Sequence, residues 1–123
     1  MKTVAVIGAS RHRHKFGNKA VRAFLRRGYN VLPINPKERE IEGLQVYRSV
    51  LDVPRDIDIA TVYVPSDIGE KIITEIVTKG IPELWLNPGA DGDLVIQRAK
   101  ILGKEPVLGC SIIAIGESPD DYG

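Results

Sequence analysis

Short apolar runs alternate with amphipathic stretches along this chain. Residues 3–7 (TVAVI) are apolar on both faces, which is typical of a strand buried between two layers of helices. Asn18 is placed to cap a helix whose apolar positions recur at helical spacing, and Gly28 is placed to end that helix in a left-handed conformation. The pattern therefore predicts a strand, a loop and a helix over residues 3–28.

The alternation of strand and helix continues to residue 108. Further strands are predicted at residues 30–34, 59–64, 83–86 and 106–108. One helix has Ser66 as its expected cap and a buried apolar stripe from Ile68 to Val77, and another runs from Asp91 to Leu102. Between residues 37 and 58 the pattern predicts only a turn at Glu42-Gly43 and a short capped helix at residues 49–52. Parallel neighbours need crossover connections, so the sequence predicts a doubly wound α/β fold with a parallel five-stranded sheet in a three-layer α/β/α sandwich.

The length of 123 residues, with 43% apolar and 27% charged residues, fits one globular domain. That domain is expected over residues 1–116. Residues 117–123 (ESPDDYG) have the composition of a C-terminal tail and are expected to fray.

The cysteine count and the hydropathy of the chain indicate the cellular compartment in which the protein is expected. The only cysteine, Cys110, permits neither an intramolecular disulfide nor a cysteine-based zinc site. The N-terminus lacks the charge, apolar run and cleavage site of a secretory signal. No apolar stretch approaches the roughly 18 residues that a membrane-spanning helix needs. A soluble, cytoplasmic protein is expected.

Charge is distributed unevenly although the net charge is only +1. Residues 1–30 contain eight lysines and arginines and no acid, whereas residues 31–123 contain nine basic and sixteen acidic residues. A positive field confined to one part of the chain favours a small anionic ligand over a nucleic acid.

The loop after the first strand is the first candidate site, because ligands of open α/β sheets bind beyond the carboxyl ends of the strands. It joins small residues at 8–10 to the cations Arg11, Arg13 and Lys15. Small residues let a ligand approach the backbone, and arginine adds bidentate bonds to phosphate. The loop therefore indicates phosphate binding, with a plain solvated basic loop as the alternative.

The residues after the second strand, Asn35, Pro36 and Lys37, refine the expected ligand. A dinucleotide fingerprint is absent, because only Gly8 of G-x-G-x-x-G is present, and no acid follows the second strand to bind a ribose hydroxyl. A lysine there suits a ribose that carries a phosphate, as in NADP or coenzyme A.

Several kinds of chemistry lack the residues they need. His12 and His14 have no third ligand at metal spacing, so no metal site is expected. Cys110 is more typical of a small buried apolar residue than of a reactive thiol. No nucleophile and base can be nominated, so no catalytic residue is predicted.

Five segments, in order along the chain, carry a resemblance to a known family: residues 4–10 (VAVIGAS), 28–37 (GYNVLPINPK), 46–54 (VYRSVLDVP), 63–65 (YVP) and 84–89 (LWLNPG). They resemble the coenzyme A-binding domains found at the N-terminus of the succinyl-CoA synthetase α subunit and as small separate proteins. The resemblance covers residues 2–116. It implies a Rossmann-like five-stranded sheet and coenzyme A as the cofactor.

The resemblance also implies roles for individual residues. Residues 8–11 match the loop that wraps the coenzyme A phosphates, and His12 and Arg13 continue it. Pro36-Lys37 match a segment whose lysine meets phosphate, and Val64-Pro65 match the floor beside the adenine. Residues 86–88 match a contact after the fourth strand. The expected binding set is therefore Gly8, Ala9, Ser10, Arg11, His12, Arg13, Asn35, Pro36, Lys37, Val64, Pro65, Leu86, Asn87 and Pro88.

Two departures limit what the resemblance implies. The first loop is rich in Arg and His, where the synthetase loop is rich in Gly, Ser, Thr and Gln. The synthetase phosphohistidine lies in a second domain, so ligase activity is not implied. The preferred hypothesis is a non-catalytic module that binds coenzyme A or an acyl-CoA, with no nucleic-acid or membrane partner. The alternatives are an NADP-binding oxidoreductase subunit and a protein-interaction domain with a vestigial nucleotide pocket.

Overall fold

The computed structural model describes residues 1–123 and every side chain except that of Ser66, the residue expected to cap the second long helix. Five parallel strands form one sheet in the order β2-β1-β5-β6-β7. Their bounds are β1 Thr3–Ile7, β2 Asn30–Ile34, β5 Ile59–Val62, β6 Glu83–Leu86 and β7 Val107–Leu108. The predicted parallel five-stranded sheet is confirmed.

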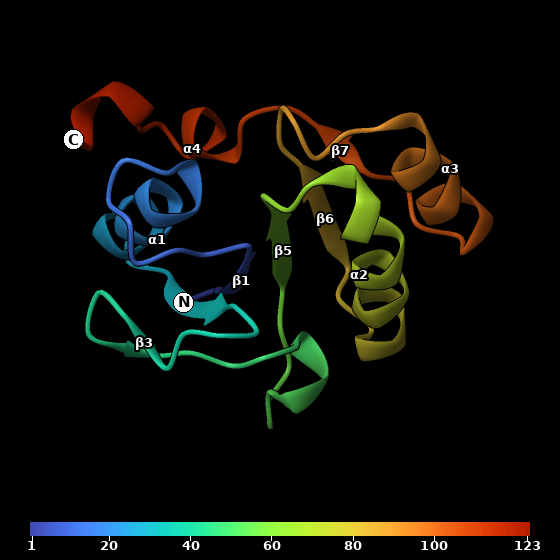
Figure 1. Ribbon diagram of the computed structural model, residues 1–123, viewed down its shortest axis with the longest axis horizontal. Helices are drawn as coiled ribbons and strands as arrows, with labels where there is room; N and C mark the ends of the chain where they lie inside the picture. The colour runs from blue at the N-terminus through green and yellow to red at the C-terminus, as the bar shows by residue number, and fades with distance from the viewer.

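Helices cover both faces of the sheet, as expected for a three-layer sandwich (Figure 1). Helix α1 (Phe16–Arg26) and the short helix α4 (Ser111–Ala114) pack on one face, and α2 (Ser66–Lys79) and α3 (Asp93–Ile101) pack on the other. None of the described helices combines the length and the apolar character needed to cross a membrane.

Strand β1 contributes side chains to the hydrophobic clusters on both faces of the sheet. Its side chains alternate, so Val4 and Val6 pack against α1, whereas Ala5 and Ile7 pack in the cluster under α2 and α3. All five residues of the strand are buried. This two-sided burial is the reason that the strand is continuously apolar, and it fixes its carboxyl end, where the chain turns at Gly8.

The segment between β2 and β5 contains a hairpin that the sequence did not predict. Strands β3 (Glu40–Ile41) and β4 (Leu44–Gln45) pair antiparallel around the predicted turn. Both turn residues have positive φ, 50° at Glu42 and 76° at Gly43, as tight hairpin turns of the primed type require. Strands of two residues are too short to produce a readable alternation. The short capped helix is confirmed as η1 (Val50–Asp52), where the Ser49 hydroxyl accepts from the Leu51 amide at 3.1 Å.

Two predictions about the helices are wrong. Helix α1 begins at Phe16, so Asn18 does not cap it but lies buried in its first turn. The apolar stripe of α2 includes the buried Ile73 and Ile76, but Ile68 is 47% exposed because it lines an open cavity at the protein surface.

The tail was expected to fray and instead folds back. It forms a short helix, η2 (Pro119–Asp121), and Tyr122 is only 7% exposed because it packs against the α1 face of the core. The Tyr122 hydroxyl donates a hydrogen bond to the Glu117 carboxylate.

Candidate functional site

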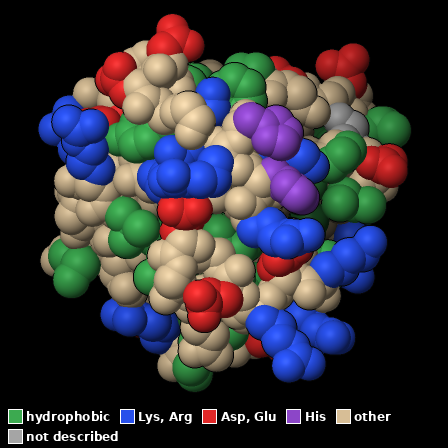
Figure 2. Space-filling view, turned by 60° about the vertical axis from the view of Figure 1, so that its left-hand side comes forward, with side chains coloured by type: hydrophobic (Ala, Val, Ile, Leu, Met, Phe, Trp, Pro, Cys, Tyr) green, Lys and Arg blue, Asp and Glu red, His purple; other side chains and the backbone are tan. Residues whose placement is uncertain are grey.

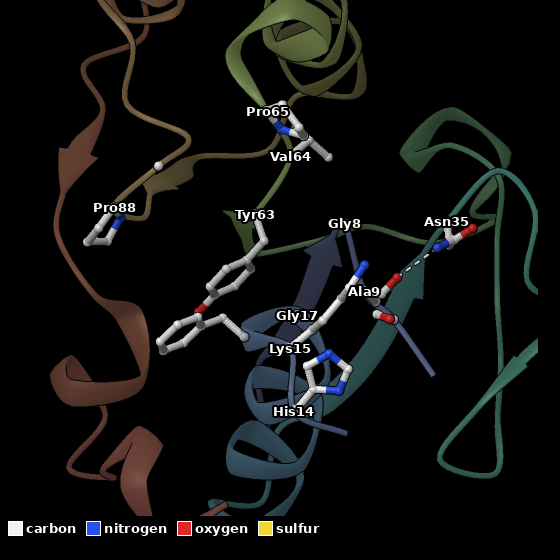
Figure 3. A pocket seen from close by; sticks show the side chains of 13 residues that line it. Gly8, Ala9, His14, Lys15, Gly17, Asn35, Tyr63, Val64, Pro65 and Pro88 are labelled. Carbon is white, nitrogen blue, oxygen red and sulfur yellow. Dashed lines mark hydrogen bonds between the residues drawn. The ribbon is translucent and has the colours of Figure 1, made fainter. Parts of the chain in front are cut away.

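A cavity of about 680 Å³ opens where the order of the strands reverses, at the carboxyl ends of β1 and β5. Strand β1 leads to β2 on one side, and β5 leads to β6 on the other. This crevice is the usual ligand site of doubly wound sheets. Its lining comes from four loops and the start of α1, and Figure 3 shows Asn35 and Pro88 on opposite flanks. The lining residues are Gly8, Ala9, Ser10, His14, Lys15, Phe16, Gly17, Asn35, Tyr63, Val64, Pro65, Pro88 and Gly89.

Two glycines allow α1 to begin directly on the end of β1. Gly8 has a φ of 88°, and its amide donates to the Ile34 carbonyl at 3.2 Å. A Cβ at Gly17 would lie 2.2 Å from the Gly8 carbonyl oxygen, so the two backbones meet where no side chain fits. A Cβ at Gly8 would lie 3.0 Å from the Tyr63 carbonyl carbon, so a side chain there would strain the fold before it met a ligand.

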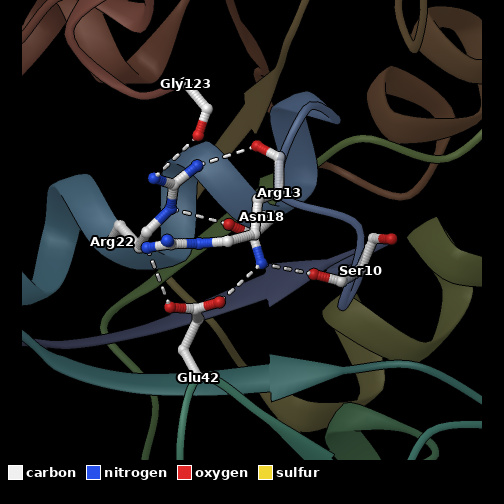
Figure 4. Close-up of polar contacts among 6 residues, drawn as sticks. All are labelled: Ser10, Arg13, Asn18, Arg22, Glu42 and Gly123. Carbon is white, nitrogen blue, oxygen red and sulfur yellow. Dashed lines mark hydrogen bonds and ion pairs between the residues drawn. The ribbon is translucent and has the colours of Figure 1, made fainter.

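Side chains from α1 and the β2 loop hold the β1–α1 loop in place. Asn18 donates to the Ser10 carbonyl at 2.8 Å, and Asn35 donates to the Ala9 carbonyl at 2.8 Å. Arg22 donates to the Asn18 amide oxygen at 2.7 Å and to the Arg13 carbonyl at 2.8 Å, so one guanidinium ties the helix to the loop (Figure 4). The loop is therefore preorganised by hydrogen bonds to its carbonyl groups.

The first turn of α1 gives this cavity the character of an anion site. The first amides of a helix have no partner within it, and Phe16 and Gly17 line the cavity. That turn contains no acidic residue, and the side chain of Lys15 adds positive charge at the cavity wall, which His14 also lines. The two histidines lie side by side on this face among lysines and arginines (Figure 2), with ring centroids 6.0 Å apart.

Arg11 and Arg13 lie outside the cavity lining. Arg11 pairs with Glu38 at 3.4 Å, and Arg13 pairs with Glu42 at 3.5 Å; both arginine side chains are more than half exposed. Among the residues that the structure describes, no such ion pair involves Lys15. The cation that lines the cavity without an acidic partner is therefore Lys15, not either of the two arginines.

A second, smaller cavity of about 240 Å³ adjoins the first at Gly8 and Val64. Its floor is apolar, with Ile7, Ile34 and Ile72. Two cations, Arg48 and Lys71, line it together with one acid, Glu75, whose carboxylate accepts from the Ser49 hydroxyl at 2.6 Å. Pro36 lines this cavity, whereas Lys37 is exposed and lines neither cavity. An apolar slot with cations at its edge suits the flat aromatic base of a nucleotide whose ribose carries a phosphate.

A third cavity, of about 230 Å³, adjoins the main one on the opposite side, toward α4. It shares Phe16, Tyr63 and Pro88 with the main cavity. Asn87 lies at its wall but is bound within the protein: its amide group donates to Thr61 Oγ1 at 2.7 Å, and its oxygen accepts from the Ser111 amide at 2.9 Å. Leu86 has no exposed surface and belongs to the core, so its predicted contact with a ligand is wrong.

Tyr63 is the titratable group whose pKa changes most at the site. Its hydroxyl is 3.2 Å from the Ser111 hydroxyl. Burial raises the pKa of Tyr63 to about 12, against the opposing effect of that hydrogen bond. At neutral pH the phenol is therefore uncharged.

The raised pKa of Tyr63 predicts a loss of stability in alkaline solution. Ionisation is harder in the folded chain, so the stabilising effect of the neutral phenol is complete below pH 10 and is lost as pH rises through about 12. We expect an ultraviolet titration to show tyrosinate forming near pH 12, and the Tyr63→Phe variant to lack that step. A titration that is the same in the variant would contradict the assignment.

Some residues of the predicted binding set line a cavity in the structure, and others do not. Seven predicted residues line the main cavity, namely Gly8, Ala9, Ser10, Asn35, Val64, Pro65 and Pro88. Pro36 and Asn87 line the adjoining cavities. Arg11, His12, Arg13, Lys37 and Leu86 line none of the three cavities.

Several lining residues were missed. Lys15 was named among the cations of the loop but left out of the expected binding set. His14, Phe16 and Gly17 follow the expected loop residues directly, and a helix start at Phe16 was the signal that could have found them. Arg48 lies within a segment that carried the resemblance, but nothing local links it to a cavity. Among the described residues, no group of three or more His, Cys, Asp or Glu side chains could hold a metal ion.

Comparison with known proteins gives one family match, to a CoA binding domain over residues 2–115. A solved structure of a conserved hypothetical protein from Pyrococcus furiosus is 36% identical, with a TM-score of 0.86 over 93% of this chain and 99% of that one.

Curated relatives include larger enzymes. An ADP-forming acetate–CoA ligase of Methanocaldococcus jannaschii is 41% identical over 80 residues, which are 65% of this chain and 11% of the enzyme. The α subunit of acetate–CoA ligase I from Pyrococcus furiosus is 32% identical over 106 residues, 81% of this chain and 23% of the subunit. The chain therefore spans a quarter or less of these two relatives.

Proposed function

The chain belongs to the CoA binding domain family, and from that premise we propose that it holds coenzyme A in the three adjoining cavities without transforming it. Coenzyme A, the cofactor predicted from the sequence, is confirmed by this family. The observation that carries the proposal is the cavity at the strand reversal, where the first turn of α1 meets the ammonium group of Lys15.

The chemistry of the three cavities indicates how coenzyme A is oriented when it is bound. The diphosphate lies in the main cavity, over the Gly8–Ser10 turn and the first amides of α1, because that wall is positive and free of acidic side chains. The adenine lies in the slot on Ile7, Ile34 and Ile72, and the 3′-phosphate lies at its rim between Arg48 and Lys71. The pantetheine arm then runs in the opposite direction, toward Tyr63 and Pro88.

The residues around the proposed ligand support a role in binding without catalysis. Behind the pantetheine end, Thr61, Asn87 and Ser111 are bound to one another and hold the loops. The Cys110 thiol lines the third cavity, but no His, Asp or Glu side chain among the described residues lines that cavity to serve as its base. The unpaired thiol of Cys110 fits a reducing compartment, and we place this function in the cytoplasm.

Calorimetry with coenzyme A and NADP tests the proposal. We expect saturable one-to-one binding of coenzyme A and much weaker binding of NADP. Preferential binding of NADP would support an oxidoreductase subunit, and binding of neither would support a protein-interaction role. Incubation with acetate, ATP and coenzyme A is expected to give no acetyl-CoA, and its formation would contradict the non-catalytic role.

The 3′-phosphate assignment predicts weaker binding of dephospho-CoA. Charge pairs at the slot rim are screened over roughly 8 Å at physiological ionic strength, so the affinity for coenzyme A falls with added salt. We expect Lys71→Ala to reduce the difference between the two ligands, because it removes one of the two rim cations.

Lys37→Ala is the matched control for this test. Lys37 is exposed and lines none of the three cavities, so its removal is expected to leave the preference for coenzyme A over dephospho-CoA intact. Equal affinities of the wild-type chain for the two ligands at low salt would refute the 3′-phosphate site.

A further inference from the structure

The third cavity, beside α4, differs from the other two in its chemistry. No charged side chain lines it. Its walls include Phe16, Pro88, Ile113 and Pro119, and it opens into the main cavity along Phe16, Tyr63 and Pro88. A ligand that extends from the main cavity past Tyr63 therefore enters an apolar space.

Apart from the Cys110 thiol, the polar side chains that line this cavity are already bound within the protein. Asn87 donates to the Val62 carbonyl at 3.0 Å as well as to Thr61, and Ser111 lies 2.7 Å from Thr61 and 3.2 Å from the Tyr63 hydroxyl. A polar ligand group entering this space would lose its hydration and find few free partners. The cavity therefore favours an apolar occupant.

Two large apolar side chains stand exposed at this cavity. Phe16 is 55% exposed and Ile113 is 63% exposed, and both line it. An apolar group lying between them would remove their surfaces from water, which is favourable in proportion to the area buried.

From this we propose that the cavity formed by Phe16, Tyr63, Pro88 and Ile113 is an acyl pocket, and that the ligand of this site is the thioester of coenzyme A with a short, uncharged acyl chain. The inference rests on the proposed function, which sets the direction of the pantetheine arm. The cavity has a volume of about 230 Å³. A water-sized group takes about 30 Å³ in a liquid, so the pocket holds roughly seven or eight non-hydrogen atoms, which fits a hexanoyl group with its carbonyl oxygen.

A titration series with coenzyme A, acetyl-CoA, butyryl-CoA and hexanoyl-CoA tests the pocket in the wild-type chain. Each methylene buried is expected to increase affinity about fourfold, which corresponds to ~0.8 kcal/mol per CH₂. Succinyl-CoA, which ends in a carboxylate, is expected to bind about tenfold or more weakly than butyryl-CoA, because the pocket offers that charge no partner.

Two isoleucine variants locate the effect. Ile113→Trp fills the pocket and is expected to abolish the increase of affinity with chain length. Ile101→Trp makes the same substitution at a 75% exposed position on α3, outside all three cavities, and is expected to keep the full increase. Both positions are exposed, so both variants are expected to fold, which circular dichroism checks.

The outcomes separate this inference from the proposed function. Binding of coenzyme A with no dependence on acyl length would overturn the acyl pocket and leave the proposed function intact. An increase that survives in folded Ile113→Trp would place the acyl group elsewhere and also overturn it. Absence of binding by every ligand in the series would overturn both. The wild-type series decides the question even if Ile113→Trp does not fold.

Discussion

Replacement of Gly17 by alanine is expected to abolish tight binding of coenzyme A and to destabilise the fold. The added Cβ would lie 2.2 Å from the Gly8 carbonyl oxygen. The Cβ is fixed to the helix backbone and the oxygen belongs to the β1–α1 backbone, so no side-chain rotation relieves the clash and α1 has to move away from β1. Overpacking of this kind typically lowers the free energy of unfolding by about 1–3 kcal/mol. The same movement displaces the Gly8–Ser10 turn from the first amides of α1, so affinity falls by about tenfold or more. Thermal unfolding and calorimetric titration measure the two effects.

Gly103→Ala is the matched control for loss of stability. Gly103 has a φ of 81° at the end of α3, and a Cβ there would meet nothing within 4 Å. Alanine in this left-handed conformation lowers the free energy of unfolding by about 1 kcal/mol without touching the site. We expect Gly103→Ala to bind coenzyme A like the wild-type chain. If folded Gly17→Ala also binds normally, the close approach of α1 to β1 does not form the site.

Replacement of Lys15 by alanine is expected to weaken binding of coenzyme A about tenfold while leaving stability almost unchanged. Lys15 is exposed, lines the main cavity and flanks the first turn of α1, so its ammonium group contributes charge where the diphosphate lies. A charge-assisted hydrogen bond of this kind contributes about 1.5 kcal/mol. Titration with coenzyme A at low and moderate salt measures the loss, which is expected to shrink as salt increases.

Arg13→Ala provides the comparison, since Arg13 is a cation of the same loop. Its side chain is 60% exposed, pairs with Glu42 at 3.5 Å and lies outside the cavities. The variant is expected to change affinity less than twofold, because an exposed ion pair contributes about 0–1 kcal/mol and does not touch the ligand. A larger loss in Arg13→Ala than in Lys15→Ala would return the phosphate contact to the arginine that the sequence analysis nominated.

The sheet could be predicted from the sequence because each strand is marked locally. Residues 3–7 and 59–62 are apolar on both faces, and a glycine at position 80 ends the helix that follows β5. The hairpin of β3 and β4 could not be predicted, since two-residue strands carry no period. The packing of Tyr122 against the α1 face of the core could not be predicted for a different reason. A polar tail has no local pattern that indicates that one aromatic ring is buried in the core.

The site was predicted in position but not in detail. Gly8 and Asn35 follow strands directly, so the rule for strand ends places both at the cavity. Arg11 and Arg13 form ion pairs with Glu38 and Glu42. These acids are remote in sequence, so the sequence of the loop alone could not show that the two arginines are paired with acids and lie outside the cavity. Lys71 lines the second cavity together with Ile7, Ile34 and Arg48, which are remote in sequence, so no local pattern around Lys71 indicates this position.

An NMR titration with coenzyme A tests the central claim most directly, because the 13.5 kDa chain is small enough for every amide to be followed. We predict that the largest shifts fall on residues 8–17 and 63–65, where the diphosphate meets the β1–α1 loop and the end of β5. Saturable shifts confined to other parts of the chain, with residues 8–17 unmoved, would contradict the account.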